Sequence, residues 1–220
     1  MTRLGQSSSD PKRILLIDDQ EVVRIGLKKM LSDAFSGVVC GETGDTKEAL
    51  QLAKENQWDL VILELSIDRK SGLDLLKQIK SALAKVPILV VTRYSEQQWA
   101  VRAIKAGAAG YVTKINKAAE LLRAAKQVLQ GGRYVSASLA ETLSADLHRN
   151  TPEAIHELLS DRELQVMRLI GSGKTGGEIA ALLCISDKTV STYRARILDK
   201  TGMKTNAELI RYAVEQGFID

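Results

Sequence analysis

The chain has 220 residues, of which 45% are hydrophobic and 26% charged, as in an ordinary globular protein with one large domain or two small ones. No apolar run approaches the roughly 18 residues that a membrane-spanning helix needs, so we expect no membrane partner. The net charge of +4, with a pI near 9.0, indicates only weakly that the partner is a polyanion.

The start of the chain, residues 1–11, has no apolar core and is predicted to be a disordered tail rather than a signal peptide or an amphipathic anchor. Cys40 and Cys184 lie in apolar stretches and have no CxxC partner, so we expect two small buried hydrophobic residues. This use of cysteine fits a reducing cytoplasm.

Strand and helix patterns alternate between residues 12 and 131. Strands are expected at residues 13–18, 38–42, 60–65, 87–92 and 110–112, and helices at residues 21–33, 45–56, 73–83, 96–106 and 117–129. Such alternation predicts an α/β, doubly wound, five-stranded parallel sheet of the flavodoxin-like kind, covered on both faces.

Beyond Gly132 the strand patterns stop. Residues 132–156 are predicted to form a linker that is partly helical, because Leu139, Leu143 and Leu147 recur every four residues. His148 and His156 fall in this region without metal spacing and are expected to be solvated surface histidines. Residues 157–220 have purely helical patterns, which predict an all-α, four-helix domain.

That last domain begins with a capping box, Ser160-Asp161-Arg162-Glu163. A short helix at 177–183, a turn at 184–186 and a longer helix at 187–201 then make a helix-turn-helix, followed by a helix at 206–216. Between Asp187 and Lys204 lie five basic and two acidic residues, so the positive charge is concentrated on the longer helix.

Carboxylates end two of the predicted strands of the first domain. Asp18 and Asp19 close the first apolar run and Glu64 closes the third. The carboxyl ends of parallel strands share one edge of the sheet, where three acidic groups would repel each other without a cation such as Mg²⁺. Thr92 and Lys114 close the fourth and fifth strands, and a hydroxyl and an ammonium there suit phosphoryl oxygens.

With these residues in place, residues 12–131 resemble the receiver domain of bacterial two-component response regulators. Residues 157–219 resemble the helix-turn-helix domain of the NarL/FixJ, or LuxR-type, class. The resemblance implies that a metal ion is bound by Asp18, Asp19, the backbone carbonyl of Ser66 and the carboxylate of Glu64. It also implies that Thr92 is the switch hydroxyl, Lys114 the phosphate-binding lysine and Tyr111 the aromatic switch residue.

The chain departs from the receiver pattern at three places. The family has its phosphoacceptor aspartate where this chain has Glu64, Met-Pro where it has Ile67-Asp68, and proline where it has Ile115, although Gly72 matches. Glu64 is one methylene longer than aspartate, so we expect severely impaired phosphoryl acceptance and an incomplete imitation of the activated state. The intact pocket argues that Glu64 replaced an aspartate recently or by design. The alternative is a natural receiver that is not phosphorylated.

A helical projection of residues 187–201 places Val190, Ile197 and Leu198 on the arc that faces the core. The opposite arc, with small polar residues near its N-terminal half, suits close approach to base edges. It carries Lys188, Ser191, Thr192, Ala195, Arg196 and Asp199. The residues predicted to reach phosphates are Lys174, Lys188, Thr189, Tyr193, Arg194 and Lys200. A small helical interaction domain is the alternative, and the local charge opposes it.

The leading hypothesis is a transcription regulator in a phosphorelay, which binds double-stranded DNA as a homodimer. A sensor histidine kinase is its implied partner and RNA polymerase a further candidate partner. The second hypothesis is a phosphorylation-independent pseudo-receiver that acts mainly as a protein-interaction or phosphate-sink module. A flavodoxin-like enzyme is disfavoured, because Asp18-Asp19-Gln20-Glu21 stands where a Gly-rich phosphate loop would be, and we expect no enzymatic activity.

Overall fold

The computed structural model describes residues 11–67, 72–147, 155–216 and 218, which divide into two compact units after Leu139. The predicted tail, apart from Pro11, lies outside the described residues, as do Asp68 and the linker residues 148–154 with His148. Within the described ranges, no helix has the length and apolar character needed to cross a membrane.

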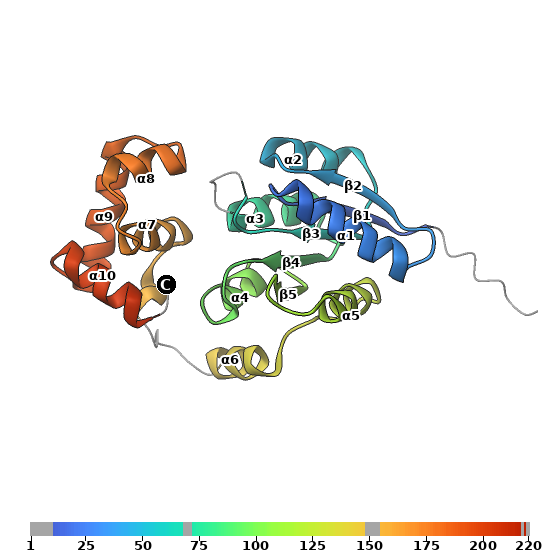
Figure 1. The fold of residues 1–220 in the computed structure, drawn as a ribbon. Coiled ribbons are helices and arrows are strands. Elements are labelled where there is room, and N and C mark those ends of the chain that lie inside the picture. The colour runs from blue at the N-terminus through green and yellow to red at the C-terminus, as the bar shows by residue number, and fades with distance from the viewer. Residues whose placement is uncertain (1–10, 68–71, 148–154, 217, 219–220) are drawn as a thin grey trace, which may run out of the picture. The chain divides into compact units, whose positions relative to one another are not determined.

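The first unit is built on one parallel sheet with the strand order β2-β1-β3-β4-β5 (Figure 1). Its strands are β1 (Arg13–Ile17), β2 (Val39–Thr43), β3 (Leu60–Leu63), β4 (Ile88–Thr92) and β5 (Gly110–Thr113). Its helices are α1 (Glu21–Ala34), α2 (Thr46–Glu55), α3 (Gly72–Ala82), α4 (Glu96–Lys105) and α5 (Ala118–Leu129). The predicted doubly wound α/β fold is confirmed.

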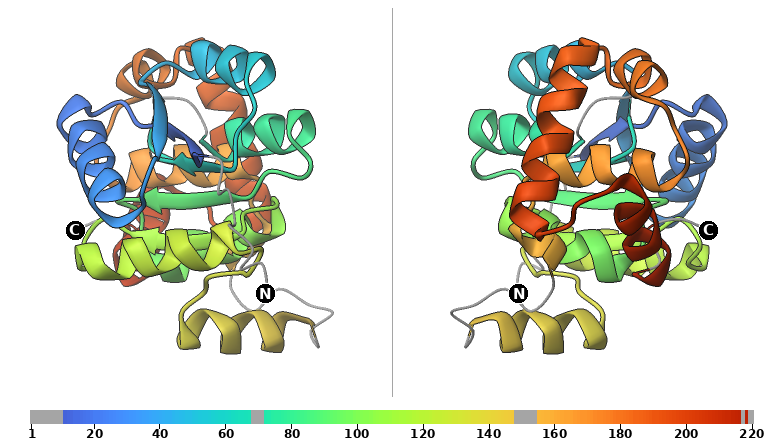
Figure 2. Two further views of the ribbon diagram at one scale, coloured as in Figure 1. Left: turned by 90° about the vertical axis from the view of Figure 1, so that its right-hand side faces the viewer. Right: turned by 90° about the vertical axis from the view of Figure 1, so that its left-hand side faces the viewer.

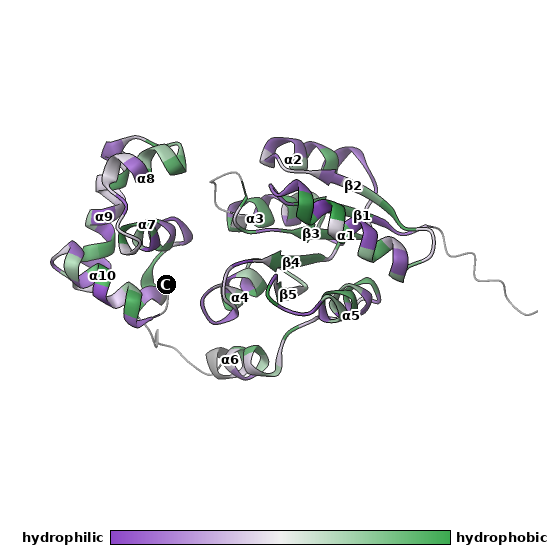
Figure 3. Ribbon diagram, in the orientation of Figure 1, coloured by the Kyte–Doolittle hydropathy of each residue, from purple (hydrophilic) through white to green (hydrophobic). Residues whose placement is uncertain are grey.

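The central strands are apolar throughout because helices cover both faces of the sheet. Every residue of β3 and β4 is buried, and both strands are among the hydrophobic parts of the ribbon in Figure 3. Helices α1 and α5 contact each other, while α3 contacts both α2 and α4 (Figure 2). The sheet thereby holds the carboxyl ends of β1, β3, β4 and β5 at one rigid edge.

Beyond residue 154, the described part of the second unit contains a 3₁₀ turn, η1 (Ile155–Leu158), and four helices. These are α7 (Asp161–Gly171), α8 (Gly176–Leu183), α9 (Asp187–Thr201) and α10 (Asn206–Glu215). Ser160 and Glu163 form the predicted capping box at the start of α7, and Thr175 and Glu178 form a second one at α8. Helix α8 packs on α9 and α7 packs on both α9 and α10, which confirms the helix-turn-helix arrangement.

The predictions for Cys184 and His156 are wrong, whereas that for Cys40 holds in part. Cys40 is half-buried and packs against the core of the first unit. Cys184 is exposed, because it occupies the left-handed C-cap position of α8 (φ 53°) at the surface turn. His156 is not a solvated histidine. It is half-buried, and its Nδ1 lies 2.9 Å from the hydroxyl of Tyr212. Its ring packs edge-on against the ring of Phe218, with the two ring centroids 4.8 Å apart.

The first unit continues beyond residue 131, where the sequence pattern placed the end of the receiver. Tyr134 forms a parallel bridge with Gly110 of β5, through hydrogen bonds from the Tyr111 amide to the Tyr134 carbonyl (3.1 Å) and from the Tyr134 amide to Ala109 (2.9 Å). Leu139 is 3% exposed. The linker helix α6 (Ala137–Leu147) therefore begins on the first unit.

Candidate functional site

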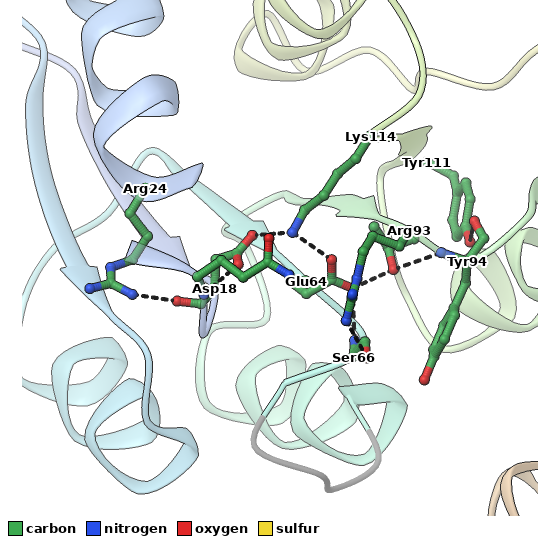
Figure 4. A network of polar contacts seen from close by, with 10 residues as sticks. Asp18, Arg24, Glu64, Ser66, Arg93, Tyr94, Tyr111 and Lys114 are labelled. Carbon is green, nitrogen blue, oxygen red and sulfur yellow. Dashed lines mark hydrogen bonds and ion pairs between the residues drawn. The ribbon is translucent and has the colours of Figure 1, made fainter. Parts of the chain in front are cut away.

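Four of the predicted pocket residues meet at the carboxyl edge of the sheet. Asp18, Glu64, Thr92 and Lys114 each follow or end a different strand. Figure 4 shows Lys114 joined by polar contacts to Asp18 and Glu64, and the Thr92 hydroxyl donates to Glu64. Asp18, Glu64 and Thr92 are buried. The strand order that places β1, β3, β4 and β5 side by side is what brings these distant residues together.

Lys114 reaches between the two carboxylates. Its Nζ lies 2.6 Å from Oδ2 of Asp18 and 2.7 Å from Oε2 of Glu64. Burial raises the pKa of Asp18 above its usual value, although the contact with Lys114 and the hydrogen bond from the Gln20 amide (2.9 Å) oppose this. The ammonium therefore balances negative charge at a place that water hardly reaches.

Glu64 uses both of its carboxylate oxygens. Oε2 faces Lys114, while Oε1 accepts hydrogen bonds from the Thr92 hydroxyl and from the Ser66 amide, the latter at 2.7 Å. The side chain is 1% exposed. A hydroxyl, a backbone amide and an ammonium thus converge on Glu64, the donor set that would suit a phosphoryl group.

The loop after β4 connects this pocket to Tyr111. The Tyr94 amide donates to Oγ1 of Thr92 (3.3 Å), and the Tyr94 carbonyl accepts from the hydroxyl of Tyr111 (3.0 Å). Tyr111 is 1% exposed. The predicted switch residue Tyr111 is therefore buried and bonded to the loop that follows Thr92, the predicted switch hydroxyl (Figure 4).

Helix α9 presents the predicted DNA-reading surface. Val190 and Ile197 are buried and Leu198 is half-buried, as the helical projection predicted. All members of the opposite arc are exposed: Lys188, Ser191, Thr192, Ala195, Arg196 and Asp199. Ser186 caps the helix by accepting from the Thr189 amide, so the N-terminal turn that would approach base edges is well formed.

Some of the residues predicted to contact DNA phosphates already contact other residues of the second unit. Lys200 lies 2.7 Å from the buried carboxylate of Glu163, and Nε of Arg194 donates to Asn206 at 2.6 Å. Lys174 lies 3.9 Å from Glu178 at the start of α8. Lys188 is exposed, whereas Thr189 and Tyr193 are half-buried.

Comparison with known families agrees with this geometry. Residues 14–126 match the response regulator receiver domain, and residues 157–213 match the LuxR family of bacterial regulatory proteins. The response regulator GacA of Pseudomonas viridiflava is 33% identical over 212 residues, which cover 94% of this chain and 98% of that protein. The chain belongs to the two-component response regulators of the NarL/FixJ class.

Other members of this family are similar over the same length. The response regulator UvrY of Escherichia coli K12 is 32% identical over 205 residues, covering 93% of this chain and 94% of UvrY. A structure of the RcsB response regulator of Salmonella typhimurium has a TM-score of 0.70 at 24% identity, covering 94% of this chain and 98% of that one, which shows a shared fold. This response regulator therefore has a receiver domain and a LuxR-type DNA-binding domain.

The regulator's pocket does not gather every predicted residue. Asp19 is exposed, unlike Asp18. In the part of the chain that the structure describes, no three His, Cys, Asp or Glu side chains form a group that could hold a metal ion. The two buried carboxylates would suit Mg²⁺, but both already face Lys114, so a metal ion would compete with that ammonium.

Arg24 is a pocket residue that the sequence reasoning missed. Its Nη1 donates to the backbone carbonyl of Asp18 at 2.7 Å (Figure 4). Its Nε lies 3.5 Å from a carboxylate oxygen of Glu42. These contacts hold the turn after β1 against the first helix. A basic residue one turn into α1, six residues beyond Asp18, is the only sequence signal for it.

Proposed function

We propose that Glu64 acts as a built-in substitute for the phosphorylated aspartate of a response regulator, so that the receiver of this transcription regulator rests in an active-like state. The observation that carries this proposal is the hydrogen bond from Thr92 to Glu64. Lys114 and the Ser66 amide join the same carboxylate, and Tyr111 is buried and bonded to the loop that follows Thr92.

The same geometry opposes phosphoryl transfer to Glu64. The extra methylene shifts the carboxylate by about 1.5 Å relative to aspartate, and misplacement of about 1 Å can cost about 100-fold in rate. Both oxygens are already engaged, Oε2 in the ion pair with Lys114 and Oε1 in hydrogen bonds from Thr92 and the Ser66 amide, so attack on a phosphoryl group would have to compete with these interactions. Glu64 supplies one negative charge, whereas a phosphoryl group supplies up to about two, so the imitation is incomplete.

Mg²⁺ belongs to the same proposal as a weakly bound ion. Asp18, Asp19 and the backbone carbonyl of Ser66 would hold it, and it would neutralise charge on a transferring phosphoryl group. The interaction of Lys114 with Asp18 weakens this site, because the ammonium must move before the ion can bind.

The output is sequence-selective binding of double-stranded DNA by a homodimer. Helix α9 would enter the major groove, with Ser191, Thr192 and Arg196 facing bases and Lys188 reaching a phosphate. Ile210 and Val214 of α10 are 37% and 57% exposed, and these apolar side chains are available to a second copy. A sensor histidine kinase and RNA polymerase are the further proposed partners, and a reducing cytoplasm the proposed location.

The deciding experiment compares DNA affinity among receiver variants of the full chain. Glu64→Asp and the isosteric Glu64→Gln should each weaken binding about fivefold or more, since each removes part of the interaction with Thr92 and Lys114. Treating Glu64→Asp with acetyl phosphate and Mg²⁺ should restore the affinity, whereas the unchanged chain and Glu64→Gln should not respond. Equal affinity in all these samples would refute the proposal.

One observation favours a second function, a receiver that mainly binds another protein. A cavity of about 310 Å³ opens between α1 and the start of α5, lined by Val23, Leu27, Met30 and Leu121 among others. Two further apolar side chains in this region are exposed: Val22 of α1 is 82% exposed, and Ile115, between β5 and α5, is 89% exposed. If DNA binding were weak and independent of salt, this interaction role would become the better account.

A further inference from the structure

The first residue of α4 is bonded to the residues that start the linker helix. Glu96 accepts hydrogen bonds from the hydroxyls of Ser136 and Ser138, the second at 3.0 Å, and the two hydroxyls lie 3.0 Å apart. Glu96 and Ser136 are both half-buried. Forty residues separate them in the chain, so this contact joins two otherwise separate elements of the first unit.

The same hydroxyl of Ser136 also caps the start of α6. Its oxygen accepts the Leu139 amide at 3.0 Å, as an N-cap residue does, and so satisfies one of the free amides at the start of α6. Because the oxygen accepts from Leu139 while the hydroxyl hydrogen is donated to Glu96, the cap is oriented by α4. The first turn of α6 and the first residue of α4 are therefore held together.

The start of α4 is in turn connected to the pocket. Thr92 binds Glu64 through its hydroxyl and the Tyr94 amide through its oxygen. The ring of Tyr94 stacks on Trp99 of α4 with centroids 4.8 Å apart, and Trp99 is 4% exposed. A change at Glu64 can thus reach Glu96 through a loop only three residues long, which spans Arg93 to Ser95.

A different set of contacts fixes the chain just before Ser136. Tyr134 pairs with β5 through its backbone, and its hydroxyl donates to Glu120 of α5 at 3.1 Å. Gln127 of α5 also donates to the carbonyl of Arg133 at 2.6 Å. These contacts involve β5 and α5 rather than α4, so they should persist when only α4 shifts.

We propose that Glu96 and Ser136 form a latch through which the state of the Glu64 pocket controls the start of linker helix α6. With Thr92 drawn to Glu64, Glu96 orients the Ser136 cap and the first turn of α6 is stable. When Thr92 is released, Glu96 shifts with α4, the cap is lost, and α6 frays from its first turn. This inference rests on the proposed control of the DNA-binding domain by the receiver, and it assigns positioning roles to Glu96 and Ser136.

Hydrogen exchange on the full chain tests the latch without measuring DNA binding. Glu96→Ala and Ser136→Ala should each speed amide exchange in residues 137–144 by roughly two- to tenfold, and Thr92→Ala should do the same from a distance. Gln97→Ala, at the exposed residue next to Glu96, is the control and should leave the exchange unchanged. In a Glu96→Ala background, Thr92→Ala should add nothing further.

Two results would overturn the latch: unchanged exchange in α6 after Thr92→Ala, or an undiminished effect of Thr92→Ala in the Glu96→Ala background. DNA affinity, measured on the same variants, separates this inference from the proposed function. Thr92→Ala should weaken binding, and Glu96→Ala should remove that dependence. If exchange in α6 responds to Thr92→Ala but DNA affinity does not, the latch stands and the receiver's control of DNA binding is refuted.

Discussion

Thr92 donates its hydroxyl to the carboxylate of Glu64, and the two side chains come from neighbouring strands at the same edge of the sheet. Each group is also held by a further partner: Thr92 accepts the Tyr94 amide, and Glu64 pairs with Lys114. Receiver chemistry requires an acceptor that is free to react. In this chain Glu64, which stands at the proposed acceptor position, is instead held by the other residues of the pocket.

The unchanged chain should therefore not accept a phosphoryl group, whereas Glu64→Asp should. A shorter side chain draws the carboxylate back from Thr92 and frees an oxygen for attack. Intact mass measurement after incubation with acetyl phosphate and Mg²⁺ gives the answer, with Glu64→Gln as the unreactive control. A stoichiometric phosphoryl adduct on Glu64 itself would contradict the expectation.

Replacing Lys114 by methionine should strengthen Mg²⁺ binding, because Asp18 and Glu64 then lose the ammonium that faces them both. Calorimetric titration measures this directly, and Lys117→Met, at an exposed position, is the matched control. The Asp18→Asn, Asp19→Asn double variant should bind Mg²⁺ more weakly than the unchanged chain. Equal affinity in those two proteins would show that the ion binds elsewhere.

Substitutions on α9 should separate into two kinds. Lys188→Ala should weaken binding to all DNA sequences alike and reduce the salt slope by about 1. Changes at Ser191, Thr192 or Arg196 should alter the preferred bases, at a cost of about 1–3 kcal/mol at the cognate position. The two half-sites should lie about one helical turn, or a multiple of it, apart.

Mobility shifts on a selected-sequence pool at several salt concentrations measure these effects, with Lys126→Ala in the receiver as the control. A changed base preference in Lys188→Ala, with none in Thr192 or Arg196 variants, would place the helix differently in the groove. Lys200 is less suitable for this test, since its loss would also leave the buried Glu163 without its ammonium partner.

The pair formed by Glu163 and Lys200 should make the stability of the DNA-binding unit depend on pH. Burial raises the pKa of Glu163, but hydrogen bonds from Lys200 and Ser160 outweigh it and hold that pKa below its usual value. A lowered carboxyl pKa in the folded state adds stability above the unfolded pKa, and this stability is lost as the pH falls below about 4. Denaturant unfolding at several pH values should show a shallower acid dependence in Glu163→Gln than in the exposed control Asp199→Asn.

Helix α8 should be stabilised by alanine at either of its first two residues. A Cβ at Gly176 would meet nothing within 4 Å, and one at Gly177 would only touch Asp187 at 4.0 Å, while neither backbone has positive φ. Each change should raise the free energy of unfolding by about 0.5–1 kcal/mol. Gly173→Ala, where φ is +75°, should destabilise the unit instead. If thermal unfolding showed that Gly173→Ala stabilises the unit as much as Gly176→Ala and Gly177→Ala do, this expectation would be refuted.

The sequence allowed the sheet, the helices and most of the pocket to be predicted, because these depend on local patterns. Apolar runs marked the strands, and the polar residue that ended each run marked the pocket edge. The contacts of Arg24 with Glu42 and of Glu96 with Ser136 could not be predicted in this way, since they depend on side chains that folding brings together. The exposure of Cys184 was missed for a different reason: its sequence neighbours are apolar, but its backbone forms a surface turn.

The bridge between Tyr134 and β5 has a consequence for the integrity of the sheet. The last strand of an open sheet exposes unpaired amides and carbonyls, which can recruit a strand from another molecule. Tyr134 covers part of that edge by pairing with Gly110 and Tyr111. A fragment ending at residue 131 would lack Tyr134, so the edge of β5 would be unpaired and the fragment should self-associate at high concentration. A fragment ending after Leu139 keeps Tyr134 and should self-associate less.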